Sequence, residues 1–336
     1  MSVPRLKLDP LLRNVLVPID FGMCSEKALL RALPIAKYYK ATVTLLHVML
    51  SEHLSLKDKD SVRDEAWRDM RKLEADLIAR ALRPDVPRRL LVEEGKIWPV
   101  ISGVLKKYNI DLIVMGTHGR TGLEILLLGS FAETVFRRAT CPVLTVGPKS
   151  RPATSNSAVK NVLFATDFSD ESEAAEPYAF SLASSRGATL SLVNVVKPSF
   201  GWGHKLQADQ KRLSYAQARL RATASYAASC KLGPIPNLIA EVGPVVDTIV
   251  KVAIQLKADL IVLGASAPRT LADRLGETPA YRVVCTAPCP VLTIREPSRI
   301  DYFERLFAQM PKSKSPEGLP MRPSTPVVSN ALTGRK

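Results

Sequence analysis

The chain has 336 residues, of which 46% are hydrophobic and 24% are charged, and its formal net charge is +15. This composition is typical of a globular protein of about two domains, and it excludes collagen-like, coiled-coil and wholly disordered chains. No apolar run approaches the ~18 residues of a membrane span, so we expect no membrane contact. The five cysteines have neither CxxC nor metal-ligand spacing, so we expect neither a disulfide framework nor a zinc site, and a cytoplasmic protein.

Short β-branched runs alternate with helical stretches through the first half of the chain. The expected strands are 14–19, 42–48, 88–93, 110–115 and 142–146, and the expected helices are roughly 24–39, 58–82, 96–108 and 130–138. In the second helix an apolar face is formed at spacings of three and four by Trp67, Met70, Leu73, Leu77 and Ala81. Strands that alternate with helices predict an α/β fold with a doubly wound parallel sheet.

The second half of the chain repeats the first. Residues 14–21 (NVLVPIDF) recur as 161–168 (NVLFATDF) at an offset of 147, and DLIVMG at 111–116 recurs as DLIVLG at 259–264 at an offset of 148. One residue has therefore been inserted between positions 195 and 259. The chain is a tandem duplication of a domain of about 145 residues.

The repeat sets the domain boundaries. The first domain spans 1–147, a linker spans 148–158, the second domain spans 159–296, and the rest, 297–336, is a tail. The tail is rich in proline and, from Pro311 on, polar, so we expect it to be partly disordered.

Two strand ends of the first domain carry residues suited to a phosphate-bearing ligand. Asp20 follows the first strand, GTHGRTG at 116–122 follows the fourth, and Gly129-Ser130 opens a helix. Ligands of open parallel sheets bind beyond the carboxyl ends of the strands, and glycine turns and helix N-termini present N–H groups to anions. The pattern favours a nucleotide, although Ser130 with Glu133 also fits a capping box that needs no ligand.

The motif G-x2-G-x9-G-S that starts at Gly116 resembles the phosphate motif of the universal stress protein family. Asp20, the DLIVMG strand and the CPVLTV strand at 141–146 resemble that family as well. The resemblance covers 12–147 with the full motif and 159–295 in a weaker form. It implies a Rossmann-like fold, ATP binding, and dimerisation through the last strand.

The resemblance also implies a set of nucleotide-contacting residues. These are Asp20 and Val48 near adenine and ribose, Gly116, Gly119, Arg120, Gly129 and Ser130 around the phosphates, and Val143 nearby. Mg²⁺ would accompany the phosphates. For the whole chain we predict two Rossmann-like, doubly wound, parallel five-stranded sheets in tandem, packed as a pseudo-dimer in which strands 142–146 and 290–294 meet.

The second domain departs from the motif. At an offset of 148, the residues Gly119, Arg120, Gly129 and Ser130 become Ala267, Pro268, Glu277 and Thr278. Pro268 removes an N–H donor, and Glu277 brings a negative charge whose repulsion at ~4 Å costs about 4 kcal/mol at an effective dielectric of 20. Thr278 remains a good N-cap and Pro279 suits the first helical position. We therefore predict one ATP per chain, held by the first domain.

The function predicted from these features is that of an ATP-binding universal stress protein, a nucleotide-dependent regulator in the stress response and not an enzyme. We expect an intramolecular pseudo-dimer, and a further homodimer stays open. The basic residues are spread along the chain without a Lys/Arg-rich block, so we do not expect nucleic acid as a partner. The alternatives are a scaffold that binds protein or nucleic acid through its basic surface, or a slow ATPase.

Overall fold

The computed structural model describes residues 12–50, 56–79, 85–117, 128–151, 159–199, 205–230, 232–265 and 278–295. In the first domain the elements are β1 (Asn14–Pro18), α1 (Met23–Tyr39), β2 (Thr42–Met49), α2 (Leu56–Ala79), β3 (Arg88–Glu94), α3 (Ile97–Lys107), β4 (Leu112–Gly116), α4 (Ser130–Arg138) and β5 (Val143–Val146). Each of the strands and helices predicted for this domain is present, with ends that differ by a few residues. The 297–336 tail and most of the linker lie outside the described residues.

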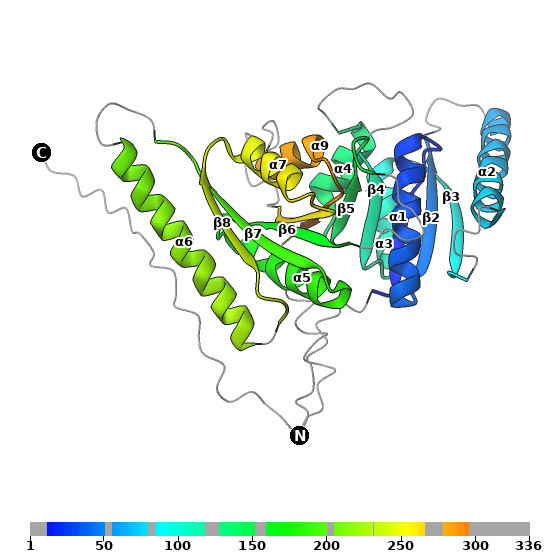
Figure 1. The fold of residues 1–336 in the computed structure, drawn as a ribbon. Coiled ribbons are helices and arrows are strands. Elements are labelled where there is room, and N and C mark those ends of the chain that lie inside the picture. Colours follow the sequence, from blue (N-terminus) through cyan, green and yellow to red (C-terminus); the bar gives the residue numbers. More distant parts are fainter. Residues whose placement is uncertain are drawn as a thin grey trace, which may run out of the picture.

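The second domain has the same element order (Figure 1). Its elements are β6 (Asn161–Ala165), α5 (Asp170–Arg186), β7 (Thr189–Val196), α6 (Lys205–Ser229), β8 (Asn237–Val242), α7 (Val245–Gln255), β9 (Leu260–Gly264), α9 (Pro279–Thr286) and β10 (Val291–Ile294). The backbone N–H of Gly95 donates to the carbonyl of Met49, and that of Gly243 donates to the carbonyl of Val196. These equivalent bonds place the inserted residue between Val196 and Gly243, inside the range that the sequence allows.

The ten strands form a single sheet in the order β3-β2-β1-β4-β5-β10-β9-β6-β7-β8. Pairing is parallel within each domain, and β5 pairs with β10 in antiparallel register, with Leu144 opposite Leu292. The prediction that strands 142–146 and 290–294 meet is confirmed. This pairing joins the two five-stranded sheets into one continuous sheet. Without it, the last strand of each domain would be an exposed sheet edge.

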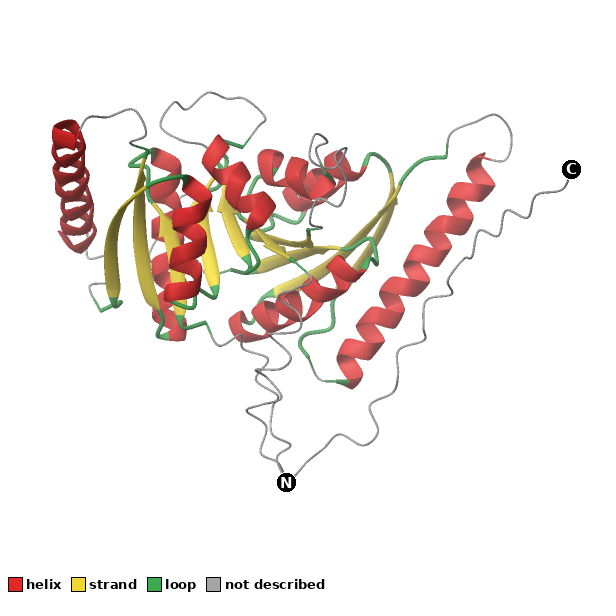
Figure 2. Cartoon of the chain, turned by 180° about the vertical axis from the view of Figure 1, so that it is seen from behind, coloured by secondary structure: helices red, strands yellow, loops and turns green. Residues whose placement is uncertain are grey.

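Helices cover both faces of this sheet. The core on one face is formed with α1, α2, α5 and α6, and the core on the other with α3, α4, α7 and α9. Figures 1 and 2 show this layering from opposite sides. Because both faces are covered, the central strands are mostly apolar, and four residues of β1 are buried.

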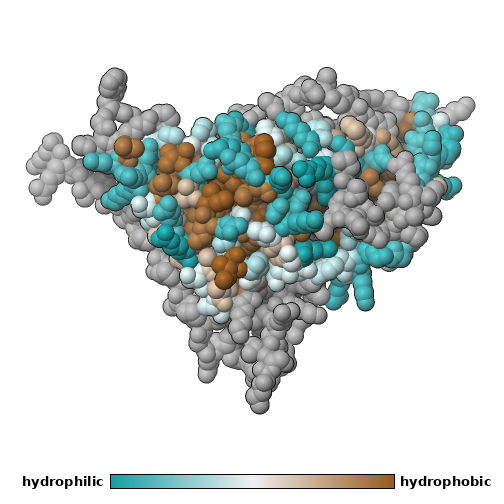
Figure 3. Space-filling view, in the orientation of Figure 1, coloured by the Kyte–Doolittle hydropathy of each residue, from teal (hydrophilic) through white to brown (hydrophobic). Residues whose placement is uncertain are grey.

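The outer elements are less enclosed than the centre. On α2 the apolar face contacts the core through Met70 and Leu73, as its spacing predicts. On the edge strand β8, Leu238 and Val242 are exposed. Figure 3 shows hydrophobic residues gathered in the middle of the face seen in Figure 1, with hydrophilic ones around them. Among the described residues no helix combines the length and apolarity needed to cross a membrane.

Candidate functional site

The candidate site lies at the carboxyl edge of the first domain's strands. Within the order β3-β2-β1-β4-β5, the chain reverses its direction of winding between β1 and β4. Asp20 lies two residues beyond β1, Gly116 ends β4, and Val48 is the penultimate residue of β2. The structure therefore brings these three predicted residues to neighbouring strand ends at the switch point, where doubly wound sheets bind ligands.

A tight turn after β1 holds Asp20. One carboxylate oxygen, Oδ1, accepts the backbone N–H of Gly22 at 2.9 Å, and Phe21 adopts a left-handed φ of 60°. The ring of Phe21 lies 4.8 Å from that of His47 between centroids. His47 Nδ1 lies 2.8 Å from the carbonyl oxygen of Ile19, and because a carbonyl only accepts, this nitrogen carries the proton. The turn holds Asp20 at the edge with its side chain half-buried.

Gly116 has a packing role that the sequence does not reveal. A Cβ at this position would lie 2.7 Å from the carbonyl carbon of Cys24, at the start of α1. In the second domain a Cβ at Gly264 would lie 2.3 Å from the carbonyl carbon of Glu171, which corresponds to Cys24. Glycine is required at both positions for helix and strand to approach, which explains why Gly264 persists where the rest of the motif is lost.

The start of α4 supplies backbone donors. Its N-cap is Gly129, whose own N–H donates to the carbonyl of Thr117 at 2.9 Å, and its first internal hydrogen bond runs from Glu133 to Gly129. The N–H groups of Ser130 and the next two residues therefore lie in the first turn, where no acceptor exists within the helix. Ser130 is exposed. These groups and the positive helix end can bind an anion.

The capping box expected from Ser130 and Glu133 does not form. The helix begins with Ser130 itself, and its cap, Gly129, has no side chain to accept a hydrogen bond. Glu133 instead pairs with Arg137, one turn along, at 2.8 Å. This helix end thus has no side-chain cap, and its first-turn donors remain directed toward the edge.

Three other predicted residues are not placed at this edge. Val143 is the first residue of β5, pairs with Ile113 and is 2% exposed. The carboxyl end of β5 is three residues away, about 10 Å at the rise of a strand. Val143 is therefore a core residue of the sheet and is removed from the candidate site. Gly119 and Arg120 lie outside the described residues.

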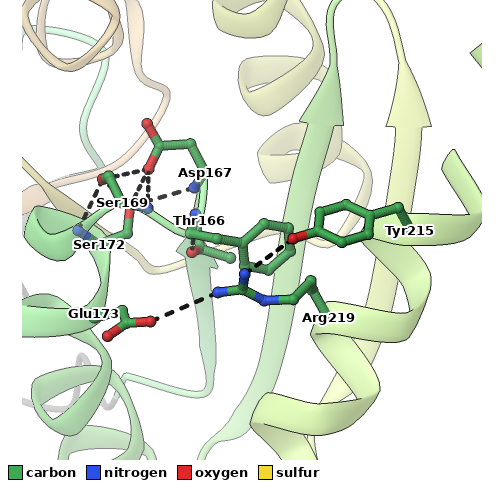
Figure 4. A network of polar contacts seen from close by, with 8 residues as sticks. Thr166, Asp167, Ser169, Ser172, Glu173, Tyr215 and Arg219 are labelled. Atoms are coloured by element: carbon green, nitrogen blue, oxygen red, sulfur yellow. Dashed lines mark hydrogen bonds and ion pairs between the residues drawn. The ribbon is translucent and has the colours of Figure 1, made fainter. Parts of the chain in front are cut away.

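In the second domain the residue equivalent to Asp20 accepts hydrogen bonds from two serine side chains (Figure 4). Asp167 Oδ1 accepts the hydroxyls of Ser169 at 2.5 Å and Ser172 at 2.6 Å. Burial alone raises the pKa of Asp167, but the hydrogen bonds from the two serines outweigh it and lower the pKa below its ordinary value. In the first domain, Gly22 stands in place of Ser169, and the hydroxyl of Ser25, which corresponds to Ser172, donates to the carbonyl of Gly22 at 2.9 Å.

Arg219 of α6 adds a second layer to this network (Figure 4). Its guanidinium donates to the hydroxyl of Tyr215 at 3.1 Å and lies 3.6 Å from a carboxylate oxygen of Glu173. It also lies 4.9 Å above the ring of Phe168. No motif or periodicity in the sequence predicts these contacts of Arg219. The serine pair at Asp167 could have been predicted, because Ser169 stands where the first domain has Gly22 at the 147 offset.

The helix that corresponds to α4 is capped by its own side chain. Thr278 Oγ1 accepts the N–H of Tyr281 at 3.2 Å, and Pro279 occupies the first helical position, as predicted. The threonine uses one first-turn N–H and the proline removes another. This helix start therefore presents fewer donors to an anion than α4 does. Ala267, Pro268 and Glu277 lie outside the described residues.

Two of the cysteines, Cys141 and Cys289, have buried thiols. All five are free thiols. Burial raises the pKa of the Cys141 and Cys289 thiols to about 12, so both are protonated at neutral pH. Cys289 belongs to the apolar core on the α3 and α9 side of the sheet, and Cys141 packs against it. In the described part of the chain, no three His, Cys, Asp or Glu side chains cluster as a metal site would require.

Comparison with known proteins gives the same division of the chain. A family model described as the universal stress protein family matches residues 12–147 and again 158–295. A universal stress protein of Methanocaldococcus jannaschii is 33% identical over 146 residues, which cover 41% of this chain and 84% of that protein. Universal stress protein A homolog 1 of Coxiella burnetii is 31% identical over 147 residues, covering 41% of this chain and 97% of that protein.

A solved structure matches across both domains. The crystal structure of a universal stress protein from Archaeoglobus fulgidus superposes with a TM-score of 0.64 at 20% identity, covering 84% of this chain and 98% of that one. At this identity the likeness shows the fold. The sequence relatives each match about the length of one domain, whereas the match to the Archaeoglobus fulgidus structure extends over both domains.

Proposed function

The chain belongs to the universal stress protein family, and we propose that it binds one ATP, in the first domain, as a nucleotide-dependent regulator. The observation that carries the proposal is the difference between the two carboxyl edges. In the first domain a helix start without a side-chain cap is hydrogen-bonded to the end of β4, the strand that pairs with β1, after which Asp20 follows. In the second domain Ser169, Ser172 and Thr278 hydrogen-bond to the corresponding groups.

The residues present fit a nucleoside triphosphate. Asp20 would accept hydrogen bonds from the ribose or the base, with Val48 packed beside it. The phosphates would lie between Gly129, the first-turn N–H groups of α4 and the motif residues Gly119 and Arg120, where the positive helix end favours their charge. Mg²⁺ would arrive with the phosphates, bound to their oxygens.

We propose a regulatory and not an enzymatic role because of the groups that phosphoryl transfer would need at this edge. Phosphoryl transfer needs a positioned base and a carboxylate for the metal, whereas our proposal assigns Asp20, the carboxylate at this edge, to the nucleoside. Binding without turnover makes occupancy itself the signal. We propose that the protein works in the reducing cytoplasm, where thiols are kept reduced.

Isothermal titration with ATP tests this proposal. We expect one site per chain in the wild type. Asp20→Ala removes a charged acceptor and should weaken binding by about 1–3 kcal/mol, whereas Asp167→Ala, the matched control, should not change the affinity. Gly129→Glu should abolish binding, because it brings into the first domain the charge that Glu277 has in the second.

Three results would contradict the proposal. Two equivalent sites would show that the second domain binds as well, and an unchanged affinity in Gly129→Glu would show that the phosphates lie elsewhere. Multiple turnover of ATP by the purified protein that is lost in Asp20→Ala would show an enzyme rather than a regulator.

A further inference from the structure

A tyrosine of the second domain contacts the chain just before the phosphate-binding helix of the first. The hydroxyl oxygen of Tyr281, on α9, accepts the backbone N–H of Leu128 at 3.1 Å. Both residues are buried, and the ring of Tyr281 packs edge-on against that of Phe136 on α4, 5.9 Å between centroids. Because the bond is shielded from water, its loss would leave a buried donor without a partner.

This bond acts at the entry to α4. Leu128 immediately precedes the N-cap Gly129, whose N–H donates to Thr117 at the end of β4. Two successive backbone N–H groups are therefore held, one by the first domain's own strand and the other by the second domain. Together they set the direction in which α4 begins, and with it the direction of the N–H groups of the first turn.

The second domain also contacts the other end of the same helix. The guanidinium of Arg295, the residue after β10, donates to the carbonyl oxygen of Phe136 and lies 5.5 Å from the centre of its ring. Phe136 belongs to the last turn of α4, where carbonyl groups favour a cation. Arg295 is buried against this turn. Both ends of α4 are thus contacted by side chains of the second domain.

The contacts are not reciprocated across the repeat. At the 148 offset the counterpart of Tyr281 is Glu133, which pairs with Arg137 of its own helix, and the counterpart of Arg295 is Gly147, which has no side chain. Equivalent domains would exchange equivalent contacts. Here the domain with the degenerate motif contributes both side chains, and both contact the helix of the intact motif.

We propose that the second domain positions the phosphate site of the first, with Tyr281 as the positioning residue. The inference rests on the proposed ATP binding by the first domain. Tyr281 is buried and acts through the backbone of Leu128. It governs the phosphate end of the site, since the turn at Asp20 belongs to β1 and α1 and has no part in this contact.

The test is Tyr281→Phe in the full chain, titrated with ATP and with adenosine. The variant keeps the ring and its packing on Phe136 and removes only the hydroxyl. We expect ATP to bind about fivefold or more weakly, which is the loss of about one hydrogen bond, while the affinity for adenosine stays that of the wild type.

Tyr38→Phe is the matched control. The Tyr38 hydroxyl donates to the carbonyl of Ser185 at 3.3 Å, so it also joins the two domains, but from the end of α1 far from the carboxyl edge. Its removal should leave the ATP affinity unchanged.

The outcomes separate this inference from the proposed function. If the wild type binds no ATP, the proposed function itself fails. If the wild type binds and Tyr281→Phe binds ATP equally well, or loses ATP and adenosine affinity to the same extent, Tyr281 does not position the phosphate site. Circular dichroism of the variant shows whether the fold is kept.

Discussion

Gly264, the last residue of β9, tests whether close packing of strand and helix requires glycine at this position. We consider Gly264→Ala in the second domain, where no nucleotide is expected and any loss of stability must come from the protein itself. The added Cβ would lie 2.3 Å from the carbonyl carbon and oxygen of Glu171, whereas ordinary contact begins at 3.4 Å. Strand or helix must therefore shift by about 1 Å.

The expected loss follows from that shift. Overpacking a well-filled interior costs roughly 1–3 kcal/mol, and we expect the upper part of that range because the atoms in the way are backbone. Gly116→Ala, where the shortest distance is 2.7 Å, should have the same sign and a smaller size. Gly103→Ala is the control, because this exposed glycine of α3 has nothing within 4 Å of the added Cβ. It should gain about 1 kcal/mol from helix propensity.

Urea unfolding without nucleotide, followed by circular dichroism, measures the three variants against the wild type. The reasoning predicts that the midpoint falls for Gly264→Ala and Gly116→Ala and rises for Gly103→Ala, with similar slopes. If Gly264→Ala is as stable as the wild type, close approach does not explain the glycine, and the retained motif position would need another cause.

Three further predictions concern the capping, charge and thiol chemistry of the structure. Thr278→Ala should lower the free energy of unfolding by about 1 kcal/mol, because the helix loses its cap. Ser130→Ala, at a helix whose cap is Gly129, should change it by a few tenths of a kcal/mol at most. Equal losses of the two variants in urea unfolding would contradict the assigned caps. Because the pKa of Asp167 is lowered in the folded state, its stabilisation is fully present above the ordinary value of 3.8 and is lost as the pH falls through the folded-state value. The stability difference between the wild type and Asp167→Asn should therefore be constant from pH 7 to 5 and shrink below pH 4, and a constant difference down to pH 2 would refute the hydrogen-bond network. The thiols of Cys141 and Cys289, with a pKa of about 12, are ionised in about one molecule in ten thousand at pH 8. Iodoacetamide should therefore label the partly exposed Cys230 before these two, as measured by peptide mass spectrometry.

Local and repeated features of this protein could be predicted from its sequence. The strands and helices follow from apolar periodicity, and the duplication follows from offsets that need no structure. Thr278 and Pro279 act at a helix start as their chemistry implies, because a cap depends only on a few consecutive residues. The meeting of the last strands was predicted because two nearly identical apolar strands would otherwise be exposed edges, whereas their antiparallel register came from the structure.

Other features depended on neighbours that are distant along the chain. Gly116 could not be recognised as a packing residue, because the backbone it approaches belongs to α1. Val143 could not be placed, because only the register shows that it lies at the amino end of a buried strand.

The partnership of Tyr281 with Leu128 joins residues 153 positions apart, and no periodicity or motif relates them. The local sequence pattern indicates which secondary structure a segment favours. The contacts between groups at a site form only when the sheet and its helices are assembled. For this reason the sequence by itself determined the fold, the repeat and the carboxyl edge at which the candidate site lies. The tertiary structure decided which residues at that edge contact one another.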